Sequence, residues 1–343
     1  MTRRAWSVAV AGATGVVGEE ILAMLDERDF PVGSLRLMAS ARSAGRTVRW
    51  RDRDVVVEDL ATADFAGVDF AFFSAGSAQA AHARRAAAAG ATVIDNSSAF
   101  REDPTVPLVV PQVNPHDLDA LRVPGDRPRP GLVANPNCST ILFVMAVAPI
   151  ERHAKIERAV VATYQAVSGS GAKALDELAR QGEQERAGQP LEATVYPKPI
   201  HANVLPFVQA FTEDGTTTEE RKLVRESRRL LGRPDLRLTA TCVRVPVRRA
   251  HSEAVNLVLE RPVSPEEARG WIRAAPGVRL VDDPASLAFP TPRDADGQDD
   301  VLVGRVRRDP SHERGLDLWL TGDQVRKGAA QNAIEIAEEL LRS

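Results

Sequence analysis

Short apolar runs alternate with amphipathic stretches through the first third of the chain. Trp6 to Ala11 is mainly apolar over the length of a buried strand, and Val16 to Arg28 repeats apolar residues at helical spacing. The same patterns predict strands at 35–39, 68–73 and 92–95 and an alanine-rich helix at 78–89. Alternating strands and helices require crossover connections, which predicts a parallel sheet covered by helices.

The pattern changes after about residue 150, where strands become more frequent. The predicted strands are 159–166, 239–247, 253–261, 301–307 and 316–320, and the predicted helices are 172–189 and 218–231. Because only a short basic turn separates 239–247 from 253–261, we expect these two strands to be antiparallel neighbours in a mixed sheet. A last helix, within 323–341, is expected to pack back on the first domain.

Length and composition fit a soluble two-domain protein. The 343 residues suit two domains, which we place at 1–134 with 322–343 and at 135–321. A net charge of −3 with no basic arm argues against nucleic acid or an anionic membrane as the main partner. No apolar run approaches the roughly 20 residues that span a bilayer.

The cysteines and histidines narrow the chemistry. Two cysteines, Cys138 and Cys242, make a disulfide framework improbable and suit a reducing cytoplasm. The six histidines are scattered, and none has metal-ligand spacing with a cysteine or another histidine, so we expect no metal site.

A glycine-rich segment follows the first strand directly. Gly12, Gly15 and Gly18 stand in AGATGVVGEE and open the first predicted helix. Glycines there permit a tight turn and let backbone amides approach a pyrophosphate, which the helix N-terminus attracts. A glycine turn without a ligand is the alternative, but the position between strand and helix favours a dinucleotide site.

The residues after the second strand bear on cofactor choice. A site that prefers NAD carries Asp or Glu about 20 residues beyond the glycine motif, whereas this chain has Ser40, Arg42, Ser43 and Arg46 in ASARSAGR. Arginine and hydroxyl groups can hydrogen-bond a 2′-phosphate that an acid would repel. We therefore expect NADP, the alternative being that these arginines only face solvent.

Cys138 is the candidate nucleophile. It stands in ANPNCSTILF, where Asn135 or Asn137 can cap the helix that follows, so the thiol is expected in the first turn. The partial positive charge of a helix N-terminus stabilises a thiolate. Cys242 lies inside an apolar strand and is better explained as a small core residue.

These blocks together identify a family. NPNCST resembles the active-site motif of aspartate-semialdehyde dehydrogenases, and further family blocks occur in order from residue 9 to about residue 333. They read AGATGVVG, ASARSAG, VIDNSSAFR, PLVVPQVNP, TYQAVSGSGAKAL, EERK, TCVRVPVRRAHSE and GDQVRKGAA. The resemblance implies a Rossmann-type parallel-sheet NADP-binding domain and an α+β catalytic and dimerisation domain with a mixed sheet.

The resemblance also implies roles for single residues. Cys138 would form the acyl thioester, His251 would act as acid and base, and Gln165 would orient the substrate. The implied substrate and phosphate ligands are Arg101, Asn137, Glu219, Lys222 and Arg244. The implied NADP(H) contacts are Gly12, Thr14, Gly15, Val16, Val17, Ser40, Arg42, Ser43, Ser74, Ala75, Gly76, Ser168, Gly169 and Gln324.

Each role has a plainer alternative. His251 by itself could be a core or solvated histidine, although its ordinary pKa suits proton transfer. Arg244 lies in an apolar strand, where an unpaired guanidinium is costly to bury, and this placement favours a carboxylate partner from the substrate or from a structural acid. Arg101 and Lys222 could be ordinary surface charges, and Glu219 with Lys222 could be a simple i,i+3 salt bridge.

Two segments depart from the family pattern. The loop SAGSAQAAH is less polar than in many relatives, and Gln324 stands where a number of them have asparagine. The implied reaction is the reversible, NADPH-dependent reduction of L-aspartyl 4-phosphate to L-aspartate 4-semialdehyde and phosphate, by a homodimer or tetramer. The rivals are an N-acetyl-glutamyl-phosphate reductase, in which glycine usually precedes the cysteine, and a non-catalytic NADP-binding relative.

Overall fold

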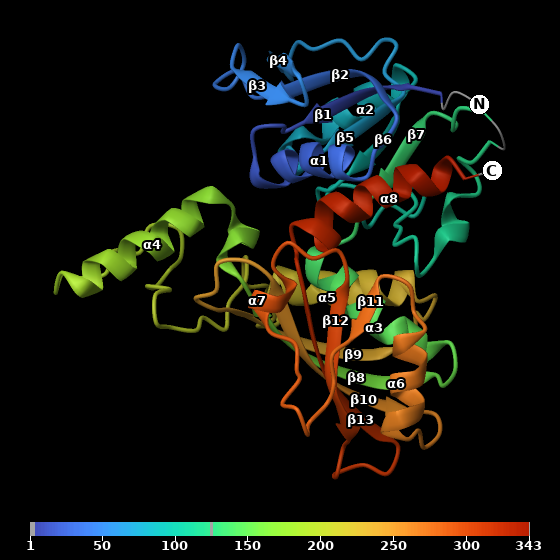
Figure 1. Ribbon diagram of the computed structural model, residues 1–343, viewed down its shortest axis with the longest axis vertical. Helices are drawn as coiled ribbons and strands as arrows, with labels where there is room; N and C mark the ends of the chain where they lie inside the picture. Colours follow the sequence, from blue (N-terminus) through green and yellow to red (C-terminus); the bar gives the residue numbers. More distant parts are fainter. Residues whose placement is uncertain (1–3, 124–125, 343) are drawn as a thin grey trace. The chain divides into compact units, whose positions relative to one another are not determined.

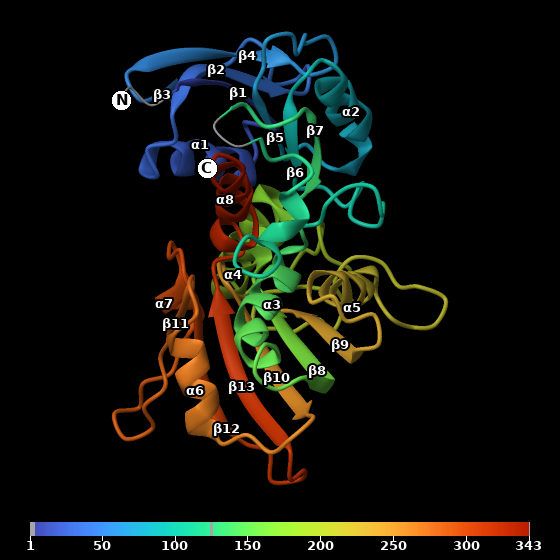
Figure 2. The ribbon, with the colours of Figure 1, turned by 90° about the vertical axis from the view of Figure 1, so that its right-hand side faces the viewer.

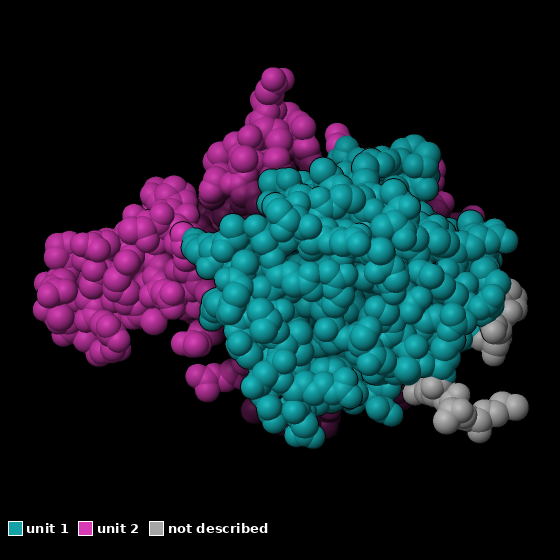
Figure 3. Space-filling model, turned by 90° about the horizontal axis from the view of Figure 1, so that it is seen from above, with its two compact units in different colours: residues 1–137, 329–343 teal, residues 138–328 magenta. Residues whose placement is uncertain are grey.

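The chain divides into two units, which are described separately. In the computed structural model, residues 4–123 and 126–342 are described. Unit 1 contains residues 1–137 and 329–343, and unit 2 contains residues 138–328 (Figure 3). The C-terminal helix therefore belongs to the same unit as the N-terminal strands.

Unit 1 is built on a seven-stranded sheet with the order β3-β4-β2-β1-β5-β6-β7. All its pairings are parallel except that of β3 with β4, as expected from the alternation of strands and helices. Its elements are β1 (Trp6–Ala11), α1 (Val16–Glu27), β2 (Val32–Ala39), β3 (Thr47–Trp50), β4 (Arg53–Asp59), β5 (Phe70–Phe73), α2 (Ala80–Ala88), β6 (Thr92–Asp95), β7 (Gly131–Ala134) and α8 (Gln331–Leu340), with short 3-10 turns at Ser77–Gln79 and Pro115–Leu118.

The central strand β1 is buried on both faces, and helices α1 and α8 pack on one of them. Val8 and Val10 pack in one core with Ile21 of α1 and with Ile334 and Ile336 of α8. Buried parallel strands typically have such continuous apolar runs. The sequence patterns did not reveal β3 and β4, whose many charged side chains conceal an edge hairpin (Figure 1).

Unit 2 contains a six-stranded mixed sheet with the order β11-β12-β13-β10-β8-β9. Helices α3, α5 and α6 contact its strands and lie on one side of it (Figure 2). Its elements are α3 (Cys138–Glu151), β8 (Ile156–Gln165), α4 (Ala172–Arg186), α5 (Thr218–Leu230), β9 (Arg237–Arg244), β10 (His251–Leu259), α6 (Pro265–Arg273), β11 (Val278–Leu280), α7 (Pro292–Ala295), β12 (Val301–Arg308) and β13 (Gly315–Gly322), with a 3-10 turn at Val167–Ser170.

The predicted pairing of the two strands joined by the basic turn is wrong. β9 and β10 are not neighbours, because β8 lies between them, parallel to β9 and antiparallel to β10. The turn 245–250 therefore crosses one strand width at the end of β8. This crossing brings the last residues of β8 and β9 and the first residue of β10 together at the same end of the sheet.

Helix α3 is apolar on every side, and all its residues from Ser139 to Ile150 are buried. Such a helix lies within a core rather than on a surface. Its first residue is Cys138, so the thiol occupies the predicted position at the start of a helix.

Candidate active site

Unit 1 brings the glycine-rich turn against the end of a neighbouring strand. Gly12 has a φ of +85°, and a Cβ atom there would lie 2.8 Å from backbone atoms of Ser74. A Cβ on Gly18 would lie 2.1 Å from the carbonyl oxygen of Gly12. Glycine is required at both positions, and Gly15 precedes Val16, the first residue of α1. The turn thus presents the amide end of a helix, which suits a pyrophosphate.

The segments that follow β2 and β5 border this turn. The hydroxyl of Thr14 donates to Ser43 Oγ at 3.3 Å, and the Ser43 amide donates to the carbonyl of Ser40 at 2.8 Å. Arg42 is exposed and has no hydrogen bond or ion pair with any described residue. No acid occupies the end of β2, where an NAD-preferring site carries one.

After β5, Ser74 is tied to the glycine turn. Its amide donates to the carbonyl of Ala11 at 2.8 Å, and its hydroxyl lies 3.3 Å from Ala11 O and 3.4 Å from Gly12 O. Ala75 and Gly76 follow, and Gly76 has a φ of +79°. The predicted contacts of unit 1 therefore gather at the carboxyl ends of β1, β2 and β5, where ligands bind in open parallel sheets. Val17 lies in the first turn of α1.

Two predicted substrate ligands also belong to unit 1. Arg101 is 9% exposed, and it donates through Nε to the carbonyl of Asn135 at 2.9 Å and through Nη2 to that of Asn96 at 2.6 Å. Arg101 therefore braces two backbone segments. Asn137 is buried and directly precedes α3. The Asn135 side chain bonds Asn96, Ala329 and Asn332.

In unit 2, three predicted residues form one row across the sheet. Gln165 is in register with Arg244 on β9, and the pairing of Ser252 with Tyr164 sets His251 beside Gln165. All three side chains are buried. The row lies at the strand ends, next to the segment 166–169.

His251 is held by a backbone amide. The N–H of Ala166 donates to Nδ1 at 3.0 Å, while Nε2 is buried without a hydrogen-bond partner among the described residues. Burial and then the Arg244 guanidinium keep the pKa of His251 well below its usual range. The imidazole is therefore neutral at physiological pH.

Arg244 is 5% exposed. Its Nη1 donates to the carbonyl of Ala166 at 2.6 Å, and its guanidinium lies 5.9 Å from the centre of the Tyr196 ring. No acid of the described chain pairs with it, and Nε is buried without a partner. A Cβ on Gly169 would lie 3.3 Å from Nη1 and 3.2 Å from His251 Nε2, so the absence of a side chain leaves room beside both groups.

Gln165 connects the row to α3 and α5. Its Nε2 donates to Ser139 Oγ at 2.9 Å and to Glu219 Oε1 at 3.1 Å. Glu219 is in the first turn of α5, where the helix dipole favours a carboxylate, and its other oxygen accepts from Gln209 at 2.7 Å. Lys222 lies 3.6 Å from the same oxygen and donates to Gln209 Oε1 at 2.6 Å. Gln209 was missed because no motif in the sequence marks its loop.

Cys138 is partly exposed and packs beside a glycine. A Cβ on Gly328 would lie 3.0 Å from Cys138 Cβ and 3.4 Å from Gln324 Cβ. Gln324 donates to Ser168 Oγ and accepts from the amide of Ala250 at 2.8 Å. Gly328 thus lies beside both Cys138 and Gln324, and Gln324 is bonded to Ser168 and to the residue before His251. Gly328 was also missed, although it lies in the block GDQVRKGAA.

Cys242 differs from Cys138 in its exposure and in its surroundings. It is fully buried in β9, and burial, followed by the nearby Glu219, raises the pKa of its thiol. The nucleophile predicted from sequence is thus the only one of the two thiols in a setting suited to reaction. No disulfide joins the two cysteines.

Comparisons with known proteins now identify the family. Residues 7–121 match the sequence model "Semialdehyde dehydrogenase, NAD binding domain", and residues 147–327 match "Semialdehyde dehydrogenase, dimerisation domain". The aspartate-semialdehyde dehydrogenase of Synechocystis sp. is 47% identical over 97% of both chains, and that of Aquifex aeolicus is 45% identical over 98% of both. The chain belongs to the aspartate-semialdehyde dehydrogenase family.

Solved structures agree with this assignment. Aspartate semialdehyde dehydrogenase II of Vibrio cholerae, complexed with ASA, has a TM-score of 0.94 at 43% identity, covering 99% of both chains. The structure of the Candida albicans enzyme with NADP has a TM-score of 0.77 at 25% identity. The predicted family, the α/β fold with a parallel-rich and a mixed sheet, and the oxidoreductase class are thereby confirmed.

Within the part of the chain that is described, no helix combines the length and apolarity needed to cross a membrane. No group of three or more histidine, cysteine or acidic side chains gathers there in a way that could hold a metal ion.

Proposed function

We propose that this enzyme catalyses the reversible, NADPH-dependent conversion of L-aspartyl 4-phosphate to L-aspartate 4-semialdehyde and phosphate through a thioester on Cys138. The family relation supports a role in amino-acid biosynthesis. The semialdehyde would serve the formation of lysine, threonine, methionine and diaminopimelate. We also propose the cytoplasm as the place of action, because neither cysteine is in a disulfide.

The observation that carries this proposal is the surroundings of Arg244. The sequence left two partners open for this buried guanidinium, a structural acid or the substrate. No described acid pairs with it, while Gly169 leaves space beside it. A buried arginine without an acid favours a carboxylate ligand. Glu219, joined to the same row through Gln165, would bind the ammonium group of the same amino acid.

The thioester chemistry follows from the position of the sulfur. At the start of α3, the Cys138 thiolate is stabilised by the helix dipole and attacks the acyl carbon while phosphate departs. Gln165 orients the acyl group, and His251 assists the later collapse of the hemithioacetal. Covalent catalysis divides one difficult reduction into two easier steps.

The turn in unit 1 fits a dinucleotide. Side chains at Gly12 and Gly18 would collide with backbone, and the space they leave, at the amide end of α1, suits a pyrophosphate. Arg42, Ser40 and Ser43 would bind the 2′-phosphate of NADP, as the absence of an acid after β2 supports. When bound, the nicotinamide supplies the hydride that reduces the thioester. Ser168, Gly169 and Gln324 of unit 2 would contact the nicotinamide.

For the departing phosphate we propose Arg101 and Lys222 as cationic ligands and Asn137 as a substrate contact. Lys222 already bonds Gln209 and lies near Glu219, so its ammonium is fixed in place. The alternative for Lys222 is a simple salt bridge with Glu219. The dependence of the rate on phosphate concentration in a Lys222 variant distinguishes this salt bridge from phosphate binding.

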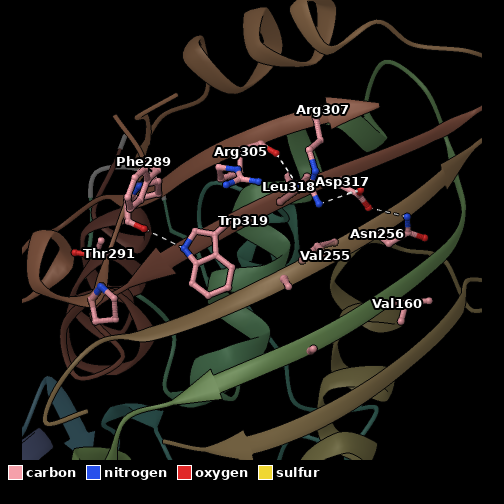
Figure 4. A pocket seen from close by; sticks show the side chains of 14 residues that line it. Val160, Val255, Asn256, Phe289, Thr291, Arg305, Arg307, Asp317, Leu318 and Trp319 are labelled. Carbon is pink, nitrogen blue, oxygen red and sulfur yellow. Dashed lines mark hydrogen bonds and ion pairs between the residues drawn. The ribbon is translucent and has the colours of Figure 1, made fainter. Parts of the chain in front are cut away.

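The open face of the mixed sheet supports assembly into a homodimer, or a tetramer of dimers. Figure 4 shows Trp319 and Phe289 beside a cavity of about 580 Å³ on the strands β8, β10, β13 and β12. Asp317 there pairs with Arg307 at 3.1 Å and accepts from Asn256 at 2.8 Å. An apolar sheet face with fixed polar groups suits a second copy of the chain, and the matched dimerisation model covers these strands.

A steady-state assay tests the proposal. Oxidation of L-aspartate 4-semialdehyde should require NADP and phosphate and should exceed that of N-acetyl-glutamate semialdehyde by orders of magnitude. The reverse preference would identify an N-acetyl-glutamyl-phosphate reductase, and binding of NADP without turnover would indicate a non-catalytic relative.

A further inference from the structure

The loop before α5 places one glutamine between two charged side chains. Gln209 donates through Nε2 to Glu219 Oε2 at 2.7 Å, and its Oε1 accepts from Lys222 Nζ at 2.6 Å. The hydroxyl of Thr218 donates to the same Oε1 at 3.1 Å. Each end of the amide thus meets the charge that suits it, because an N–H group attracts a carboxylate and a carbonyl oxygen attracts an ammonium. The reverse orientation would set oxygen against oxygen and donor against donor.

The two charged groups are not joined by a direct hydrogen bond. Glu219 and Lys222 stand at i and i+3 of α5, where an acid and a lysine can meet on one face of the helix. Here Nζ lies 3.6 Å from Oε2, which is beyond hydrogen-bond length. The amide of Gln209 therefore takes the place of a direct hydrogen bond between them.

The backbone at Gln209 adopts a left-handed conformation. Its φ is +68°, which glycine adopts more readily than a residue with a side chain. The segment is fixed on both sides, since Leu205 exchanges backbone hydrogen bonds of 2.9 and 2.8 Å with Arg244, and the amide of Thr218 donates to Ala210 O at 2.9 Å. A side chain kept in such a conformation directs attention to what that side chain does.

Both oxygens of the Glu219 carboxylate are held by glutamine amides. Oε1 accepts from Gln165, which belongs to the row with Arg244 and His251, and Oε2 accepts from Gln209. A carboxylate oxygen can accept more than one hydrogen bond, so these contacts do not prevent it from binding an ammonium group. A direct ion pair with Lys222 would instead offset the negative charge and engage the lysine, leaving each group less available to a ligand.

We propose that Gln209 is a positioning residue that keeps Lys222 from pairing directly with Glu219, so that the carboxylate is available to the ammonium group of the substrate and the lysine to its phosphate. This inference rests on the proposed function. Gln209 acts through its two charged neighbours and does not itself touch the reacting atoms.

A crystal structure of Gln209→Gly without substrate tests the separation directly. Glycine suits a φ of +68°, so the variant should fold with little change in Tm. We expect Lys222 Nζ to approach a carboxylate oxygen of Glu219 to about 2.8 Å. A separation that stays at 3.6 Å or more would overturn the proposal.

A second variant keeps the test decisive if the glycine variant does not fold. Asparagine also tolerates a left-handed backbone, but its amide is one methylene shorter than that of glutamine. Gln209→Asn should therefore show the same approach of Lys222 to Glu219, and an unchanged separation there would equally contradict the proposal.

Steady-state kinetics test the consequence for ligand binding. A hydrogen bond to a charged group corresponds to about 10-fold in affinity, so KM for the semialdehyde and KM for phosphate should each rise about 10-fold in Gln209→Gly, with kcat within about 3-fold. Asp29→Gly, at an exposed residue with a φ of +48°, is the matched control and should leave both KM values unchanged. A residue that only supports the fold would lower Tm without this split between KM and kcat. Unchanged KM values in Gln209→Gly would refute the role.

A Lys222→Ala background distinguishes separation of the charges from orientation of the carboxylate. With no ammonium left to approach Glu219, Gln209→Gly should raise KM for the semialdehyde by less than about 2-fold at saturating phosphate. If the rise in this background is as large as in the wild type, Gln209 acts by orienting Glu219, and the proposal is wrong.

Failure of this proposal and failure of the proposed function give different results. A wild-type protein without activity on the aspartyl substrate would refute the proposed function, while the distance between Lys222 and Glu219 in the variants would still be informative. An active enzyme whose Gln209 variants keep that distance and both KM values would refute the role of Gln209 alone.

Discussion

Two adjacent rows on one face of the mixed sheet hold similar types of side chain in different surroundings. The outer row holds His251, Gln165 and Arg244. The inner row lies two residues further from these strand ends and holds Glu253, Thr163 and Cys242. Successive residues of a strand point to opposite faces, so the two rows face the same side. The two rows differ in how far they lie from the ends of the strands.

The inner row is kept neutral by burial. Both carboxylate oxygens of Glu253 are buried and lack partners among the described residues, and burial, followed by Glu219, raises its pKa well above the usual range. The pKa of Cys242 is raised in the same direction. In the outer row, Arg244 and His251 are bonded to the backbone of Ala166, and Gly169 leaves space beside them. The outer row thus differs from the inner row in that loop backbone fixes its polar groups and leaves space beside them.

The largest expected difference is between the two thiols. Cys138→Ala should abolish turnover, with at least a 10³-fold loss of kcat, while NADPH binding is retained. Cys242→Ala should keep kcat within about 2-fold and lower the free energy of unfolding by about 1 kcal/mol, since it removes one buried atom. Steady-state rates and denaturant unfolding measure both. Substantial residual activity in the first variant would defeat the assignment of the nucleophile.

The next largest effect is expected from changing the guanidinium of Arg244. Arg244→Lys cannot bind a carboxylate in a bidentate manner, so KM for the semialdehyde should rise roughly 10- to 100-fold. Arg237→Lys, at the exposed start of the same strand, is the matched control and should leave KM unchanged. If both variants have wild-type KM, Arg244 does not bind the substrate.

A smaller effect is expected from filling the space beside the outer row. The Cβ of Gly169→Ala would lie within 3.3 Å of His251 Nε2 and Arg244 Nη1, which should reduce kcat/KM by about 10-fold with little change in Tm. Gly270→Ala, in α6 with no atom within 4 Å of the added Cβ, should leave activity unchanged and stabilise the protein by about 0.5–1 kcal/mol. Full activity of Gly169→Ala would show that this space is not used.

The smallest effect is a pH dependence of stability. Above about pH 4.5 the unfolded Glu253 loses its proton while the folded one keeps it, so wild-type stability falls as pH rises toward the folded pKa. Glu253→Gln lacks this loss, and its Tm should exceed that of the wild type by more at pH 8 than at pH 5. The exposed Glu213→Gln is the control. A Tm difference that shrinks with rising pH would mean that Glu253 is ionised in the fold.

Most of the candidate site could be predicted because its residues stand in short blocks. The strand, glycine turn and helix around Gly12, and the thiol at the start of α3, depend on neighbours in sequence, and the structure has them as expected. The predicted pairing of β9 with β10 is wrong because the short turn between them does not form a hairpin, and β8 lies between the two strands. Gly328 was missed because its neighbour Cys138 is distant in the chain, and Gln209 was missed because no motif marks its loop.

The sequence by itself determined the family, the alternation of strands and helices, and the residue types available for catalysis, since periodicity and local motifs encode these. Only the tertiary structure decided that His251, Gln165 and Arg244 share one row, that no described acid neutralises Arg244, and that a backbone amide holds His251. The reason is physical. Burial and hydrogen bonding, which set the charge and the position of a side chain, are properties of contacts between segments far apart in the chain.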